Sequence, residues 1–202
     1  MKKSIILIIF LISSFGFSGN KNISFIKQKK YQQEIREEEI KKPSIEETQK
    51  ESKYIPRLEK LIDYIKTQNQ LLSYSEIRYI IYNVWKYSKE NDFNPYIILS
   101  VMNVESHFRH STVSKAGARG LMQLMPFNFR EFGVNNSIEG NIKGGILHLK
   151  RDFEKQNKDI IKALVCYNAG CSRLKNQQWQ KIKETREYIP KVLKKYQEIS
   201  NL

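Results

Sequence analysis

The chain has 202 residues, of which 40% are hydrophobic and 11% aromatic. That share of apolar side chains excludes a wholly disordered chain, and the length allows one core of roughly 100–150 residues with extra segments. Lysine and arginine outnumber aspartate and glutamate by 35 to 21, and the net charge of +14 favours anionic partners: cell-wall polymers, an anionic membrane surface or nucleic acid. A solvated, lysine-rich surface without a partner explains the same charge.

Residues 1–18 have the pattern of an export signal. Two lysines precede an apolar run at 5–12, and small residues then allow cleavage after Gly16 or Ser18. The run is shorter than the about 20 apolar residues of a membrane-spanning helix, so a signal peptide is the first interpretation and an uncleaved N-terminal anchor is the alternative. We therefore expect an exported protein of the periplasm or cell envelope, and no nucleic acid as a partner.

Residues 19–72 are predicted to form a charged tether. Charged and amide side chains dominate from 27 to 53, and they offer too little apolar surface to offset the entropy lost on ordering. A short helix follows, with apolar residues at helical spacing: Leu58, Leu61, Ile62 and Ile65. This helix either docks on the next domain or binds something else, such as a partner in cell-envelope assembly.

Residues 73–202 are predicted to form a single all-α domain. Ser73 and Glu76 have the spacing of a capping box at the start of its first helix. The stripe that this helix should bury consists of Ile77, Ile80, Ile81, Val84 and Ser88. Asn94 can cap a second helix, in which Pro95 suits the first position.

The remaining helices are indicated by later apolar stripes. The first contains Ile142, Ile146, Leu149 and Phe153, and the second contains Ile160, Ile161, Leu164 and Val165. Gly170 should end the second of these helices. A last helix runs from about Thr185 to Tyr196, and Pro190 should kink it or split it in two.

The Pro95 helix places a carboxylate in an apolar stripe. Ile98, Val101, Met102 and Glu105 follow the spacing i, i+3, i+4 and i+7, which puts all four on one face. Burying an unpaired carboxylate costs several kcal/mol, raises its pKa, and so produces the property that a general acid needs near neutral pH. On spacing alone, a glutamate satisfied by a salt bridge or by helix amides explains the pattern as well.

Four ordered motifs between residues 75 and 198 resemble the lytic transglycosylase family, of the soluble lytic transglycosylase catalytic-domain type. The first is "VESHFRHSTVSKAGARGLMQLMP" at 104–126, with a Glu-Ser pair, a small-residue loop, and then Gly-Leu-Met-Gln and Met-Pro. The others are "NIKGGILHL", "ALVCYNAG" and "ETREYIPKV". The resemblance implies a lysozyme-like helical fold for residues 73–202, and peptidoglycan glycan strands as the substrate.

The same resemblance makes Glu105 the single catalytic acid/base. As an acid it would protonate the glycosidic oxygen between N-acetylmuramic acid and N-acetylglucosamine. As a base it would then take the proton of the muramyl C6 hydroxyl. The oxygen of that hydroxyl would close on C1 and give a 1,6-anhydro end. In the family, the N-acetyl group of the substrate is thought to replace the second carboxylate that glycosidases ordinarily need. Two alternatives stay open: a hydrolytic muramidase, and a non-catalytic wall-binding or assembly protein on the same fold.

Six further residues match positions that the family uses to bind substrate or to shape the cleft: Ser106, Met122, Gln123, Tyr167, Asn168 and Tyr188. Each has a structural alternative. Ser106 can bond its own helix backbone, Met122 and Tyr188 can pack in the core, Gln123 can be a buried structural amide, and Asn168 can cap its helix. Gly117 and Gly120 should serve backbone turns.

Two positions depart from the family, which often has proline where this chain has His110 and Cys171. An oxidising compartment permits a bridge between Cys166 and Cys171, but their places in and just beyond a helix make separate thiols the favoured expectation. The chain has no CxxC or HExxH spacing. We therefore expect no metal site and no cofactor.

Overall fold

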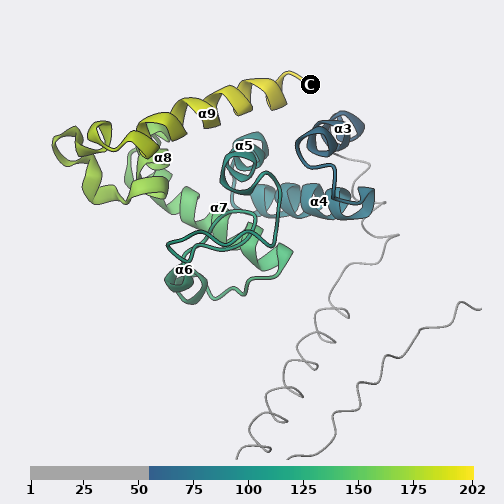
Figure 1. The fold of residues 1–202 in the computed structure, drawn as a ribbon, viewed down its shortest axis with the longest axis horizontal. Coiled ribbons are helices and arrows are strands. Elements are labelled where there is room, and N and C mark those ends of the chain that lie inside the picture. Colours follow the sequence, from purple (N-terminus) through teal and green to yellow (C-terminus); the bar gives the residue numbers. More distant parts are fainter. Residues whose placement is uncertain (1–54) are drawn as a thin grey trace, which may run out of the picture. The chain divides into compact units, whose positions relative to one another are not determined.

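The computed structural model describes residues 55–202, so the predicted export signal and the 27–53 segment lie outside the described residues. The elements are α3 (Leu58–Gln68), α4 (Tyr74–Glu90), α5 (Pro95–Ser106), α6 (Pro126–Glu131), α7 (Ile138–Lys155), α8 (Ile160–Ala169), the 3₁₀ segment η1 (Cys171–Lys181) and α9 (Lys183–Ser200) (Figure 1). Within 55–202 the only β pairing is a pair of isolated bridges, Val113 to Arg119 and Arg119 to Leu124, so the all-α prediction is confirmed for this part. None of these helices is long and apolar enough to cross a membrane.

Local signals start the helices α4 and α5 where the sequence predicts. Ser73 and Glu76 form the reciprocal capping box of α4. The side chain of Asn94 accepts a hydrogen bond from the backbone N–H of Tyr96, and Pro95 is the first residue of α5. Each cap satisfies an N–H that the first turn of a helix would otherwise leave unpaired.

Helix α5 is the central helix of the described part. In Figure 1, α9 lies above it, and α4 and α7 lie below; α5 packs directly against both α9 and α4. Its buried residues run right around the helix rather than along one stripe: Ile97, Ile98, Leu99, Ser100, Val101, Met102, Asn103 and Ser106. A helix that is apolar on all sides belongs in a core, and each large aliphatic side chain buried there contributes about 1.5–3 kcal/mol.

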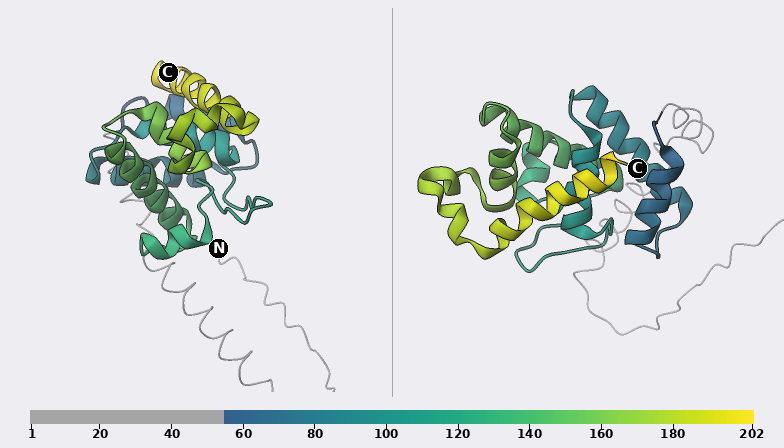
Figure 2. Two further views of the ribbon diagram at one scale, coloured as in Figure 1. Left: turned by 90° about the vertical axis from the view of Figure 1, so that its left-hand side faces the viewer. Right: turned by 90° about the horizontal axis from the view of Figure 1, so that it is seen from above.

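Helix α3 docks on the rest of the domain, which is the first of its two predicted alternatives. It packs against α4, and its residues Leu61, Ile62 and Ile65 are buried in the common core. The Tyr64 hydroxyl donates a hydrogen bond to the Glu198 carboxylate, 3.1 Å away on α9. Helix α3 therefore joins the start of the described chain to its C-terminal helix (Figure 2).

Helix α9 continues through Pro190 and is not split. Proline lacks an N–H, so the carbonyl four residues earlier loses its helical partner. The surrounding turns are held by packing, because Tyr188, Ile189 and Val192 are all buried against the core. Of the two predicted effects of Pro190, a kink or a split, the split is wrong.

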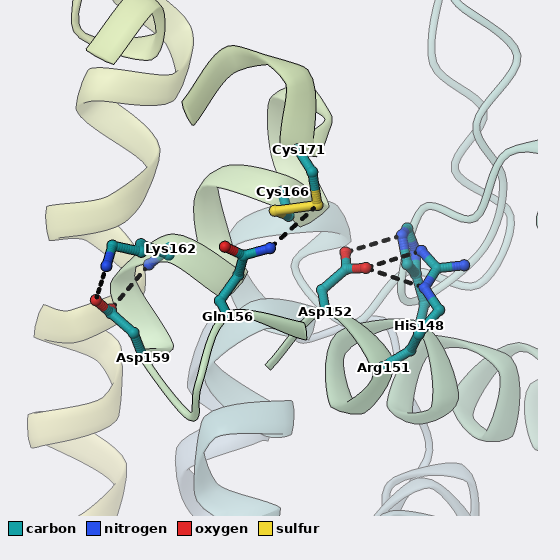
Figure 3. The surroundings of a disulfide bond; sticks show 8 residues. All are labelled: His148, Arg151, Asp152, Gln156, Asp159, Lys162, Cys166 and Cys171. Atoms are coloured by element: carbon teal, nitrogen blue, oxygen red, sulfur yellow. Dashed lines mark hydrogen bonds and ion pairs between the residues drawn. A yellow bond between two sulfur atoms is a disulfide. The ribbon is translucent and has the colours of Figure 1, made fainter. Parts of the chain in front are cut away.

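Cys166 and Cys171 form a disulfide, and the expectation of separate thiols is wrong. Gly170 adopts φ +84°, which reverses the chain directly after α8. That turn places the first residue of η1 against the last turn of α8. The bridge therefore encloses the four residues Tyr167, Asn168, Ala169 and Gly170 (Figure 3).

Candidate active site

Glu105 lies in the last turn of α5, one residue before the helix ends. The two residues after the helix, His107 and Phe108, have positive φ and turn the chain away from the helix axis. Val101 and Met102, on the preceding turn, are completely buried, while Glu105 is partly exposed. The carboxylate therefore sits where the apolar face of α5 meets the surface.

Burial raises the pKa of Glu105 from 4.5 to about 7. The Tyr188 hydroxyl acts in the opposite direction and lowers this pKa, and the charge of Glu184 raises it further. The raised pKa expected from the sequence is confirmed. Near neutral pH both protonation states of such a group are well populated, so one side chain can donate a proton and later accept one.

Two tyrosines from different helices adjoin this carboxylate. Tyr188 comes from α9, and burial first and the Glu105 charge second raise its pKa well above the usual range. Tyr167 comes from α8; its pKa is also raised, by burial and then by the charges of Glu105 and Asp152. The Tyr167 hydroxyl donates a hydrogen bond to the Met122 carbonyl at 2.7 Å. The structure thus brings together three residues that lie up to 83 positions apart in sequence.

The Tyr188 hydroxyl is buried and interacts with the Glu105 carboxyl, but at a geometry too poor for a well-formed hydrogen bond, and it makes no other hydrogen bond with a residue of the described part. Buried hydroxyls are normally satisfied, because leaving one without a partner costs about 1–3 kcal/mol. After burial, the charge of Glu105 is the largest influence on the pKa of this hydroxyl. The hydroxyl is therefore able to donate to the carboxylate or to a bound molecule.

Ser106 and Gln123 hold the backbone of the loop after α5. The Ser106 hydroxyl is buried and bonds to the carbonyls of Leu121 at 2.8 Å and Met102 at 3.1 Å, which favours the structural alternative for this residue. The Gln123 amide nitrogen donates to the carbonyls of Gly120 at 2.9 Å and Thr112 at 3.1 Å. No described residue donates to the Gln123 amide oxygen, so its acceptor remains available.

Asn141 is the first residue of the "NIKGGILHL" motif, and the sequence alone predicts no individual role for it. It is fully buried; its amide oxygen accepts from the Met122 N–H at 2.8 Å, and its amide nitrogen donates to the Arg119 carbonyl at 2.9 Å. Gly120, at φ +81°, is required beside it, because a Cβ there would come within 2.3 Å of the Asn141 amide nitrogen. The Asn-Ile motif on α7 therefore shapes the Gly-Leu-Met-Gln loop.

Met122 and Asn168 differ in their access to a ligand. The Met122 side chain has no exposed surface and packs where a Cβ on Gly145 would lie, so it belongs to the core and the predicted substrate contact is not supported. Asn168 is partly exposed and does not cap α8: the cap is Gly170, whose N–H bonds to the Cys166 carbonyl. The Asn168 side chain makes no hydrogen bond with another residue of the described part, which leaves its amide free for a ligand.

Between residues 55 and 202, no three His, Cys, Asp or Glu side chains lie close enough together to hold a metal ion. A separate hollow of about 270 Å³ lies between α8 and η1, and Trp179 and Leu174 are among the residues that line it. None of the seven candidate site residues lines that hollow.

Comparison with known proteins places residues 83–190, more than half of the chain, in the family described as "Transglycosylase SLT domain". The chain is 32% identical over 109 residues to the "Transglycosylase" of Enterobacteria phage PRD1, covering 53% of this chain and 39% of that protein. It is 29% identical over 119 residues to the membrane-bound lytic murein transglycosylase F of Desulfosudis oleivorans, covering 49% of this chain and 26% of that protein.

Among solved structures, the chain is similar to an inactive mutant of the lytic transglycosylase Slt from Pseudomonas aeruginosa. The TM-score is 0.51 and the identity 25%, over 69% of this chain and 27% of that one. The chain thus spans less than two fifths of the length of the curated relatives it matches. The matched part includes the whole stretch from α5 to the middle of α9.

Proposed function

Because the chain belongs to the transglycosylase SLT domain family, we propose that it is a lytic transglycosylase that cleaves peptidoglycan. The bond broken is the one between N-acetylmuramic acid and N-acetylglucosamine, and the product carries a 1,6-anhydro-muramyl end. The observation that carries this proposal is Glu105, whose pKa burial raises to about 7, beside Tyr167 and Tyr188.

Glu105 performs both proton transfers. In its protonated form, the carboxyl gives its proton to the glycosidic oxygen as the bond to C1 breaks. The resulting carboxylate then removes the proton of the C6 hydroxyl, whose oxygen bonds to C1, and Glu105 returns to its starting state. A pKa near the working pH suits one group to both roles, because neither proton transfer is then strongly uphill.

The neighbouring residues divide into those that face the reaction and those that hold the framework. Tyr188 can donate to Glu105 or to the sugar, and the free oxygen of Gln123 and the amide of Asn168 can bond to hydroxyl and N-acetyl groups. Ser106 fixes the end of α5 to the loop at Leu121. The net charge of +14 suits the anionic cell wall, and export to the periplasm or cell envelope is the compartment that this substrate requires.

The experiment is mass analysis of muropeptides released from purified sacculi by the full-length protein and by Glu105→Gln. Wild type should release muropeptides with anhydro ends, one water lighter than reducing ends. The variant should keep the fold, measured by circular dichroism. It should lose cleavage by at least about a hundredfold, because general acid–base catalysis typically contributes roughly 10²–10⁴-fold. Wild type that releases nothing soluble, or a variant within several-fold of wild type, would refute the proposal.

A hydrolytic muramidase is the second candidate, and Glu184 is the observation that favours it. This exposed carboxylate on α9 is close enough for its charge to raise the Glu105 pKa. Two carboxylates flanking a sugar can activate water or form a glycosyl intermediate. Reducing ends in the same mass spectra, together with loss of activity in Glu184→Gln, would favour hydrolysis; anhydro ends with Glu184→Gln still active would exclude it.

A further inference from the structure

Two polar residues of α7 and the residue that caps its C-terminus face the segment that carries Tyr167 and Asn168. His148, Asp152 and Gln156 are spaced four residues apart, which puts them on one face of the helix. Figure 3 shows this row running along α7 toward the disulfide. The Gln156 amide nitrogen lies 4.0 Å from the Cys171 sulfur, so the row reaches η1.

His148 and Asp152 form a pair inside this row. The His148 Nε2 atom lies 3.3 Å from the Asp152 carboxylate, and the two side chains are only 13% and 3% exposed. The other Asp152 oxygen accepts two hydrogen bonds from Arg151, at 2.9 and 3.0 Å. Burial disfavours the charge on Asp152, but His148 and then Arg151 outweigh it and lower the pKa of that carboxyl.

The His148 ring packs at a tilt against the Tyr167 ring. The two ring centres are 4.5 Å apart and the planes are inclined by 32°. Phe132 lies on His148 as well, at 6.0 Å. Tyr167 is thereby held at two points, by the His148 ring and by the hydrogen bond of its hydroxyl to the Met122 carbonyl.

We propose that His148, oriented by Asp152, is a positioning residue that fixes the Tyr167 ring beside Glu105. This inference rests on the proposed function, since Tyr167 matters there as a wall of the acid's site. His148 itself reaches Glu105 only through Tyr167. The ionisable groups that face Glu105 are Tyr167 on α8 and Tyr188 and Glu184 on α9.

The test compares His148→Ala, His148→Phe and Asp152→Asn with wild type in the full-length protein. Two quantities are measured: kcat and KM for muropeptide release, and the Glu105 pKa from the ¹³C shift of its carboxyl. His148→Ala should lower kcat about tenfold or more with KM little changed, since a small misplacement beside the chemistry is costly. It should also lower the Glu105 pKa from about 7 toward 4.5, because a displaced Tyr167 admits water.

His148→Phe keeps a ring against Tyr167 and should retain most of the kcat and the raised pKa. Asp152→Asn should fall between wild type and His148→Ala. Glu154→Gln is the matched control: it breaks the Lys150–Glu154 pair, also spaced four residues apart on α7 but exposed. It should change neither quantity.

If His148→Ala lowers only the melting temperature, with kcat and the Glu105 pKa unchanged, the role is structural and the inference is overturned. If His148→Ala does not fold, Asp152→Asn decides by the same two readouts. If wild type releases no muropeptides, the proposed function is refuted but the positioning inference is not. The Glu105 titration still tests whether His148 positions Tyr167.

Discussion

Replacement of Glu105 by glutamine should make the protein more stable, and the gain should depend on pH. The folded state raises the pKa of this carboxyl from 4.5 to about 7. Below pH 4.5 the group is protonated in both the folded and unfolded states and costs nothing. Between pH 4.5 and about 7 the unfolded state gives up this proton while the folded state keeps it, so stability falls as the pH rises; above about 7 the folded state carries a poorly solvated charge and the loss is complete.

The size of the loss follows from the pKa difference. One pKa unit corresponds to about 1.4 kcal/mol, so a rise from 4.5 to about 7 corresponds to about 3 kcal/mol in the free energy of unfolding. The partial exposure of Glu105 makes this an upper value. A domain of this size shifts its melting temperature by roughly 2–4 °C per kcal/mol, which gives about 6–12 °C.

The assay is thermal unfolding of wild type and Glu105→Gln at pH 4 and pH 8.5. The two proteins should melt close together at pH 4, and the variant should melt several degrees higher at pH 8.5. Glu154→Gln is the control, since Glu154 is exposed and its pKa is lowered by the hydrogen bond that it accepts from Lys150. An equal difference between wild type and Glu105→Gln at both pH values would refute the claim that Glu105 is held in a dry site.

Two further outcomes are expected. Tyr188→Phe removes the hydroxyl that lowers the Glu105 pKa, so that pKa should rise above about 7. The alkaline limb of the pH–activity profile should then move to higher pH, and a move to lower pH would contradict this. Cys166→Ser with Cys171→Ser opens a bridge between residues five positions apart, which should cost about 2 kcal/mol and lower kcat by loosening Tyr167. Reductant should affect wild type in the same way and leave the double variant unchanged; no effect of reductant on wild type would argue against a role for the bridge.

The helices could be predicted because their causes are local. Ser73 and Glu76 cap α4 through a bond pattern that spans three residues, and every residue predicted for the buried stripe of α4 is buried. The same is true of Ile98, Val101 and Met102 on α5, although burial extends around that helix. The environment of Glu105 followed from this stripe, since a carboxylate that continues an apolar face must share its burial.

The errors concern contacts that the spacing of residues within one helix does not show. The polar row His148, Asp152 and Gln156 gave no signal, because the apolar stripe of α7 accounts for the helix and nothing local shows what the other face touches. The state of the cysteines depends on the turn at Gly170, and the position of Met122, in the loop before α6, depends on Gly145 in α7. Spacing along one element cannot supply such contacts.

Asn141 and Ser106 differ from Tyr188 in how well their polar groups are satisfied. Asn141 and Ser106 are buried with their hydrogen bonds made inside the protein, and both hold the loop from Gly120 to Gln123. The Tyr188 hydroxyl is buried with only a poorly formed interaction with the Glu105 carboxyl, whose charge is itself disfavoured. A folded protein retains two costly groups side by side when something else completes them, and a glycan that takes a proton from Glu105 and a hydrogen bond from Tyr188 would relieve both costs.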